Sequence, residues 1–246
     1  MKVSIDAIVV ANRKPAGGRL YRVIAIISAI VVFVGFSRSY FLRPLFRNTP
    51  LELALHLHGA IMTLWFLLFA LQVSLVANGR SLLHQSIGVA GAVLAALLSV
   101  LALLITVYSA KQIGDFRPPT PFLGLVLISF IPFPILVGSA IHFRRQPRIH
   151  KRLMLLATVS ILGAALVRFP MNFSESGAAI FMLGGTDVLV LGSVAFDTVK
   201  HRRLHPAFAI GTLCVLAFQL SAALIAPSDA WATALAWLTK TIPGSR

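Results

Sequence analysis

Long runs of apolar residues, separated by short polar stretches, dominate this sequence. A helix needs about 20 apolar residues to cross a bilayer core of roughly 30 Å, because backbone groups must pair internally where water is absent. Seven runs approach or exceed this length, and we expect each to form a spanning helix. They cover residues 20–36, 51–77, 86–108, 121–143, 151–169, 178–199 and 206–226. The pattern therefore predicts an all-α, polytopic transmembrane helix bundle.

The two ends of the chain differ from this bundle. Residues 1–19 are polar and no small-residue cleavage site follows the first apolar run, so we expect a retained N-terminal segment rather than a signal peptide. Residues 20–226 form one bundle. Residues 227–246 contain a stretch too short to span, in which Trp231, Leu235, Trp237 and Leu238 have helical spacing. This stretch predicts an amphipathic helix lying at the interface, with both indoles as anchors.

Composition supports a membrane protein and excludes a soluble one. Apolar residues make up 58% of the chain and charged residues only 12%, about half of what a soluble domain carries. Lys and Arg number 22 against 7 Asp and Glu, which gives a formal charge of +15. In a polytopic protein this excess belongs to cytoplasmic loops and anionic lipid, so it does not indicate nucleic-acid binding. The distribution places the N-terminus in the cytoplasm of a bacterial inner (plasma) membrane protein and the C-terminus outside.

Basic residues gather after the fourth run, and we expect them to meet anionic lipid headgroups. They are Arg144, Arg145, Arg148, Lys151 and Arg152. The lone cysteine, Cys214, lies within an apolar run and allows neither an internal disulfide nor a cysteine metal site.

Histidines form two candidate sites. His56 and His58 near the start of the second run are possible metal ligands, although two residues apart they point to different sides of a helix. His84, His142 and His150 begin or end the third, fourth and fifth runs on one side of the membrane. These three are candidate ligands of a b-type heme, or alternatively residues that stabilise helix ends and recognise lipid phosphate.

Helical spacing in the second run places His58, Met62, Trp65, Phe69 and Gln72 on one stripe, which we expect to face protein. A stripe of small residues in the third run indicates close packing and predicts a central position for that helix.

Polar groups in the later runs suggest a site at the middle of the membrane. Asp187 lies within the sixth run, where an ionisable group is costly and therefore a functional candidate. Pro132 and Pro134 interrupt the fourth run and remove backbone donors. We expect a small polar cavity here in which Arg168 pairs with Asp187; the alternative is a neutral Asp187 that only fixes helix packing.

Three stretches, 35–46, 56–88 and 149–169, resemble a widespread group of uncharacterised bacterial multi-pass membrane proteins. The pattern combines His-x-His-Gly, a later Trp, Gln and His, then His-Lys-Arg-Leu-Met and an Arg, over roughly residues 20–200. Here these positions are His58, Gly59, Trp65, Gln72, His84, His150, Lys151, Arg152, Leu153, Met154 and Arg168. Gln85 stands where similar sequences often have Arg. The resemblance implies the topology and the choice of residues, and no activity.

Three functions compete at this point. The first is a non-catalytic protein that binds a lipid or small amphiphile, or serves as a subunit of a membrane complex. The second is a redox protein with heme on the histidines of one side. The third is a proton-coupled transporter that uses Asp187. The sequence contains no Walker, zincin, Ser-His-Asp or Cys-x-x-Cys pattern, which argues against enzymes of those types.

Overall fold

The computed structural model describes residues 18–46, 50–111, 120–169 and 175–241, and these form helices joined by short turns. Much of the expected N-terminal segment 1–19, and the end of the chain from 242, lie outside the described residues. Within them, seven helical segments are long and apolar enough to cross a membrane, which confirms the predicted number. The fold is all-α, with no strand in the described residues, as expected.

The helices have the following bounds. The first span is α2 (Gly18–Phe36), which continues through a π-helical turn, η1 (Ser37–Phe41), into the short α3 (Arg43–Phe46). The second and third are α4 (Leu53–Ala77) and α5 (Ser81–Lys111). The fourth is α6 (Thr120–Phe130) with α7 (Pro132–His142), and the fifth is α8 (Pro147–Ser160) with α9 (Gly163–Leu166). The sixth and seventh are α10 (Glu175–His201) and α11 (Pro206–Ile225), before the terminal α12 (Asp229–Thr241).

Local sequence explains where several helices begin and end. Pro147 and Pro206 open α8 and α11, where a missing amide hydrogen costs nothing. Between α4 and α5, Gly79 adopts a positive φ of 73°, while the Arg80 amide donates to the Leu75 carbonyl and the Gly79 amide to the Val76 carbonyl. This Schellman arrangement ends α4 and turns the chain directly into α5.

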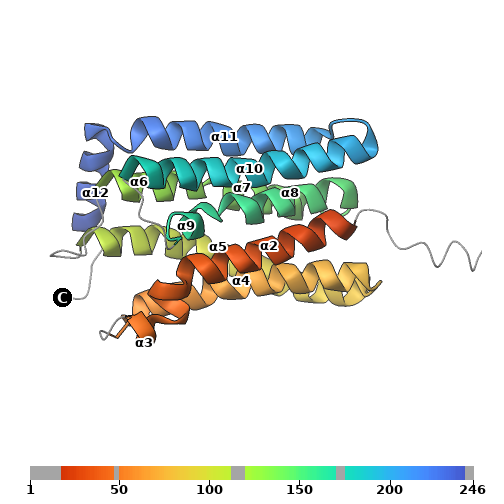
Figure 1. Ribbon diagram of the computed structural model, residues 1–246, viewed down its shortest axis with the longest axis horizontal. Helices are drawn as coiled ribbons and strands as arrows, with labels where there is room; N and C mark the ends of the chain where they lie inside the picture. Colours follow the sequence, from red (N-terminus) through yellow and green to blue (C-terminus); the bar gives the residue numbers. More distant parts are fainter. Residues whose placement is uncertain (1–17, 47–49, 112–119, 170–174, 242–246) are drawn as a thin grey trace, which may run out of the picture.

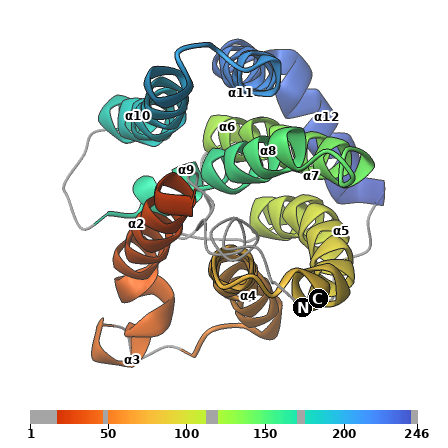
Figure 2. The ribbon, with the colours of Figure 1, turned by 90° about the vertical axis from the view of Figure 1, so that its right-hand side faces the viewer.

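The centre of the bundle is the fifth span, not the third. Within an 18-residue apolar stretch of each span, 72% of Pro147–Leu166 is buried, but only 17% of Ser81–Lys111. The prediction from the small-residue stripe was therefore wrong: a face of small residues permits close packing but does not say how many sides are covered. In the end-on view of Figure 2, α8 lies between α10 and α11 on one side and α2, α4 and α5 on the other.

The proline break in the fourth span is filled by aromatic rings. Ile131 separates α6 from α7, and its amide donates to the Ile128 carbonyl, which recovers one of the partners that the prolines remove. Phe133 is fully buried at this point and packs edge-on against Trp65, with ring centroids 4.8 Å apart. The expected stripe on α4 faces protein, since Met62, Trp65 and Phe69 are all buried.

The helix α12 crosses the end of the bundle, as Figure 1 shows. Trp231 is buried beside α5 and α6, where its indole N–H donates to the Thr120 carbonyl over 2.8 Å. Trp237, in contrast, is 62% exposed. The terminal helix was predicted, but Trp231 fixes α12 to the bundle rather than serving as a membrane anchor; for the exposed Trp237 the anchor stays a prediction.

Candidate anion-binding site

At the end of the bundle opposite α12, basic side chains surround a pocket of about 420 Å³. We call this the basic pocket. The starts of α8 and α11 and the end of α10 form it, because the turn between α10 and α11 lies beside the start of α8. It is lined by Arg148, Lys151, Arg152, His201, Arg203 and His205. The N-termini of α8 and α11 add partial positive charge to that of the side chains, which the C-terminus of α10 partly offsets.

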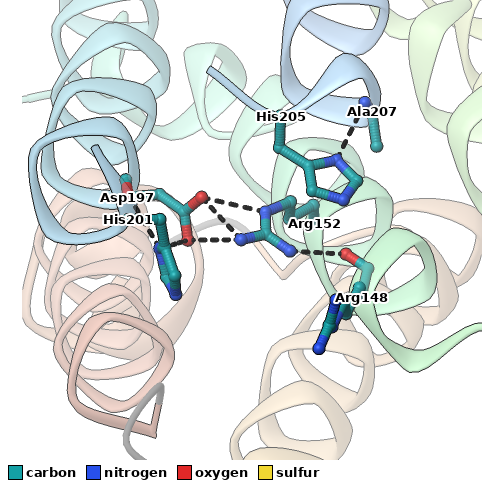
Figure 3. Close-up of polar contacts among 6 residues, drawn as sticks. All are labelled: Arg148, Arg152, Asp197, His201, His205 and Ala207. Atoms are coloured by element: carbon teal, nitrogen blue, oxygen red, sulfur yellow. Dashed lines mark hydrogen bonds and ion pairs between the residues drawn. The ribbon is translucent and has the colours of Figure 1, made fainter. Parts of the chain in front are cut away.

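A buried ion pair forms the floor of the basic pocket (Figure 3). Arg152 of α8 and Asp197 of α10 are each only 3% exposed. The Arg152 Nε donates to Asp197 Oδ2 over 2.9 Å, and its Nη2 donates to Oδ1 and Oδ2 over 2.9 and 2.7 Å. Its Nη1 donates to the Arg148 carbonyl over 2.7 Å, and the guanidinium also lies over the Phe208 ring at 5.6 Å. This geometry orients Arg152 and neutralises most of its charge.

Two histidines complete the wall on the α10–α11 side. His201 Nδ1 lies 2.8 Å from the Asp197 carbonyl oxygen and 3.4 Å from Asp197 Oδ1. His205 Nδ1 accepts a hydrogen bond from the Ala207 amide over 3.2 Å and so caps α11. Burial, together with the nearby Arg152 guanidinium, lowers the pKa of His205. Because Nδ1 accepts from the Ala207 amide, the neutral ring carries its proton on Nε2, which can donate a hydrogen bond into the pocket.

The other three cations of the basic pocket are Arg148, Lys151 and Arg203. In the part of the chain that the structure describes, Arg148, Lys151 and Arg203 form no ion pair with a carboxylate. Lys151 is half-buried and its ammonium lies 5.4 Å from the centre of the Tyr21 ring. The basic pocket therefore combines an oriented, paired arginine with three unpaired cations, an arrangement that suits a phosphate or another compact anion.

The predicted set of lipid-binding residues divides in two. Arg148, Lys151 and Arg152 line the basic pocket, whereas Arg144 and Arg145 are exposed outside its lining. Sequence reasoning missed four residues: Asp197, His201, Arg203 and His205. One signal was available, since Asp197 is an acid near the basic end of a spanning helix, and such a group needs a basic partner.

Of the three histidines proposed for heme, the structure brings two together. The rings of His84 and His150 lie with their centroids 6.2 Å apart, between α5 and α8. His142 does not join them. It is the last residue of α7, its side chain is exposed, and its ring packs edge-on against the ring of Phe143. The expectation of a three-histidine group was wrong, because the His142 ring is exposed and packs against Phe143 rather than turning toward α5 and α8.

His56 and His58, the two candidate metal ligands, lie in the first turns of α4. The exposed His56 packs its ring against Tyr40, while the Nδ1 of His58 is buried without a partner. Among the described residues, no group of three or more His, Cys, Asp or Glu is placed to hold a metal ion. His56 and His58 therefore have no third metal ligand among the described residues.

The expected pair of Arg168 and Asp187 does not form. Arg168 Nη1 donates to the Ala164 carbonyl over 2.5 Å, and its guanidinium lies over the Phe36 ring at 5.0 Å. Asp187 on α10 instead interacts with the side chain of Gln219 on α11. Arg168 follows the end of α9 and turns toward α2, so it is directed away from Asp187. Gln72, the last polar residue of the α4 stripe, lies against His84.

No protein-family model, curated protein or solved structure matches this chain.

Proposed function

We propose that the protein is a non-catalytic membrane protein that binds the anionic headgroup of a lipid in the basic pocket. One observation carries this proposal: six side chains able to hold positive charge line a single pocket, and three of them lack a carboxylate partner within the described chain. An anion replaces the missing countercharge. The paired Arg152 keeps the floor of the pocket rigid, so that little ordering is needed when the anion binds.

The position of the basic pocket favours a lipid over a free soluble anion. It lies where α8 and α11 begin and α10 ends, which is the depth of a headgroup for helices that span the bilayer. Leu204, in the turn between the lining residues Arg203 and His205, is an apolar side chain that is 50% exposed. A headgroup in the basic pocket would place its acyl chains beside this side chain.

We further propose that the end of the bundle bearing the basic pocket faces the cytoplasm of a bacterial inner membrane. Basic loops are retained on the cytoplasmic side, where anionic lipids give the leaflet a negative surface potential. On this proposal the N-terminus is cytoplasmic and α12 lies on the opposite side.

The test compares two double variants of the full chain in nanodiscs. Arg148→Gln with Arg203→Gln removes two unpaired cations of the basic pocket, and Arg144→Gln with Arg145→Gln removes the same charge from the exposed loop. Native mass spectrometry and tryptophan fluorescence measure the binding of phosphatidylglycerol, with phosphatidylcholine as the zwitterionic reference and inorganic phosphate as the soluble anion. We expect the first variant to weaken phosphatidylglycerol binding about tenfold or more, since each lost charge-assisted contact is worth about 1.5–3 kcal/mol.

The loop variant should bind nearly as the unchanged protein does. Equal losses in both variants would show that only overall charge matters, and would overturn the pocket. Binding of phosphate alone, without preference for phosphatidylglycerol over phosphatidylcholine, would overturn the lipid.

A further inference from the structure

The contact between His84 and His150 forms a second polar feature, separate from the basic pocket. Each histidine lies one helical turn inside its helix, because α5 begins at Ser81 and α8 at Pro147. Their ring centroids are 6.2 Å apart and their planes are inclined at 79°. His150 and Arg152 are two residues apart on α8, about 200° around the helix, so they face opposite sides. The imidazole pair therefore faces α5 while Arg152 faces α10.

The orientation of His150 is fixed by the backbone. Its Nδ1 lies 2.8 Å from the carbonyl oxygen of Ala140 on α7. A carbonyl oxygen only accepts, so Nδ1 carries the proton and Nε2 keeps a free electron pair. Histidines that ligate metals are typically held in this way, with the second ring nitrogen donating to a carbonyl or carboxylate.

Gln72 holds His84 from the neighbouring helix. The Gln72 amide lies against the His84 ring, and with its nitrogen turned toward His84 it donates to His84 Nδ1 and, over 3.2 Å, to the His84 carbonyl oxygen, while its oxygen accepts from the Gly88 amide over 3.2 Å. In this state the proton of His84 is on Nε2. In the opposite orientation, which lacks the two backbone hydrogen bonds, the amide oxygen faces Nδ1, and a neutral His84 then carries its proton on Nδ1. Nε2 becomes free to bind a ligand, and no proton is gained or lost overall.

We propose that His84 and His150 are the two protein ligands of one bis-imidazole metal centre. Metal–imidazole bonds of about 2.0–2.1 Å place the centroids of two opposed rings roughly 6 Å apart, which is close to the observed separation. Within the described chain no third His, Cys, Asp or Glu completes the set, so a structural zinc site with four protein ligands does not fit. Two neutral nitrogen ligands suit monovalent copper, or the iron of a heme whose porphyrin supplies the other four ligands.

The first experiment distinguishes these two sources. The full chain is purified in detergent after expression with a heme precursor, and its visible spectrum is recorded before and after reduction. The same protein is titrated anaerobically with Cu⁺ against a chromophoric copper chelator. A Soret band that shifts on reduction identifies heme iron, and about one tightly bound Cu⁺ per chain identifies copper. X-ray absorption of the loaded protein should then show two imidazole nitrogens.

Three single variants test the ligands. His84→Ala and His150→Ala should each abolish the Soret band or weaken Cu⁺ binding by at least tenfold, whereas His142→Ala, which changes an exposed histidine outside the pair, should have no effect. Binding that survives in both ligand variants, or that is lost equally in His142→Ala, overturns the proposal. So does a protein that binds neither heme nor copper.

Gln72 variants provide a readout that does not depend on removing a ligand. Gln72→Glu offers only acceptors to Nδ1–H, so it should strengthen metal binding, while Gln72→Leu should weaken it about 10- to 100-fold. If both variants bind as the unchanged protein does, Gln72 has only a packing role and the proposed exchange of the His84 proton is wrong. This test is independent of the basic pocket, because loss of lipid binding leaves the metal result unchanged.

Discussion

At the scale of single residues, the buried pair of Arg152 and Asp197 carries a large cost of desolvation. The two side chains are almost completely removed from water, and their attraction only offsets the loss of hydration if both are present. The pair joins α8, the central helix, to α10, and it orients the floor of the basic pocket. Removing one partner leaves the other charged and buried.

We therefore predict that Asp197→Ala lowers the free energy of unfolding by about 3–5 kcal/mol. The double variant Arg152→Met with Asp197→Leu should recover most of this loss, because it removes both charges and fills the space with apolar atoms. Unfolding in detergent, followed by intrinsic fluorescence with denaturant, measures the difference. A double variant as unstable as Asp197→Ala would mean that the hydrogen bond from Arg152 to the Arg148 carbonyl matters more than the pairing.

Sequence reasoning identified Arg152 but not Asp197, and the reason is physical. Arg152 is part of a dense basic run in a turn, where the sequence shows charge and nothing shows burial. Its partner is 45 residues away, on a helix whose rotation about its axis the sequence does not determine. In the same way, His84 and His150 were recognised by type, whereas the exclusion of His142 depended on the direction in which its ring points, which the sequence does not determine.

At the scale of elements, close approaches of backbone determine how the helices pack. Gly35 near the end of α2 lies directly against the carbonyl of Ala165 in α9, so that an added Cβ would overlap it. Gly211 of α11 similarly admits the side chain of Leu156 in α8, and Gly124 of α6 admits the Trp231 indole of α12. In each case a helix contacts the bundle where a side chain is absent.

We predict that Gly35→Ala lowers the free energy of unfolding by about 1–3 kcal/mol, because the Cβ has no space and the obstacle is backbone. The matched control is Gly192→Ala in α10, where nothing lies within 4 Å of the added Cβ. That change should be neutral or stabilise by up to about 1 kcal/mol through helix propensity. The same denaturant measurement checks both, and an equal loss at the two positions would contradict the packing argument.

The number and approximate positions of the helices were predictable from apolar run length, while the helix starts, breaks and depths were not. Ser81 begins α5 five residues earlier than expected, since the Asn78–Gly79 turn is shorter than a polar stretch suggests. That shift is what moves His84 from the end of the helix to its second turn. The interaction of Asp187 with Gln219 and the filling of the proline break by Phe133 depend on side-chain packing that periodicity does not contain.

At the scale of the whole molecule, the two ends of the bundle differ in character. The basic pocket and the His84–His150 contact lie toward the end where α4 passes into α5 and α10 into α11, and α12 covers the opposite end. Because seven helices in the described residues are long and apolar enough to cross a membrane, we expect these ends to lie on opposite sides of it.

We predict that residue 146 lies in the cytoplasm and residue 240 outside. Gln146→Cys and Lys240→Cys are introduced singly into a chain carrying Cys214→Ala, and intact spheroplasts are treated with a membrane-impermeant maleimide. Lys240→Cys should react at once, and Gln146→Cys only after the membrane is permeabilised. Labelling of both from the same side would contradict seven spans, and the reverse order would contradict the proposed orientation.

The Schellman turn at Asn78 and Gly79 has a consequence for what this region of the chain tolerates. Gln72 and His84 lie six residues before and six residues after Asn78, so their meeting depends on the register that this turn imposes. One inserted residue would rotate the following helix by about 100° relative to its neighbour and separate the amide from the imidazole. Epitope tags, reporter insertions and natural length variation should accordingly be excluded from this hairpin.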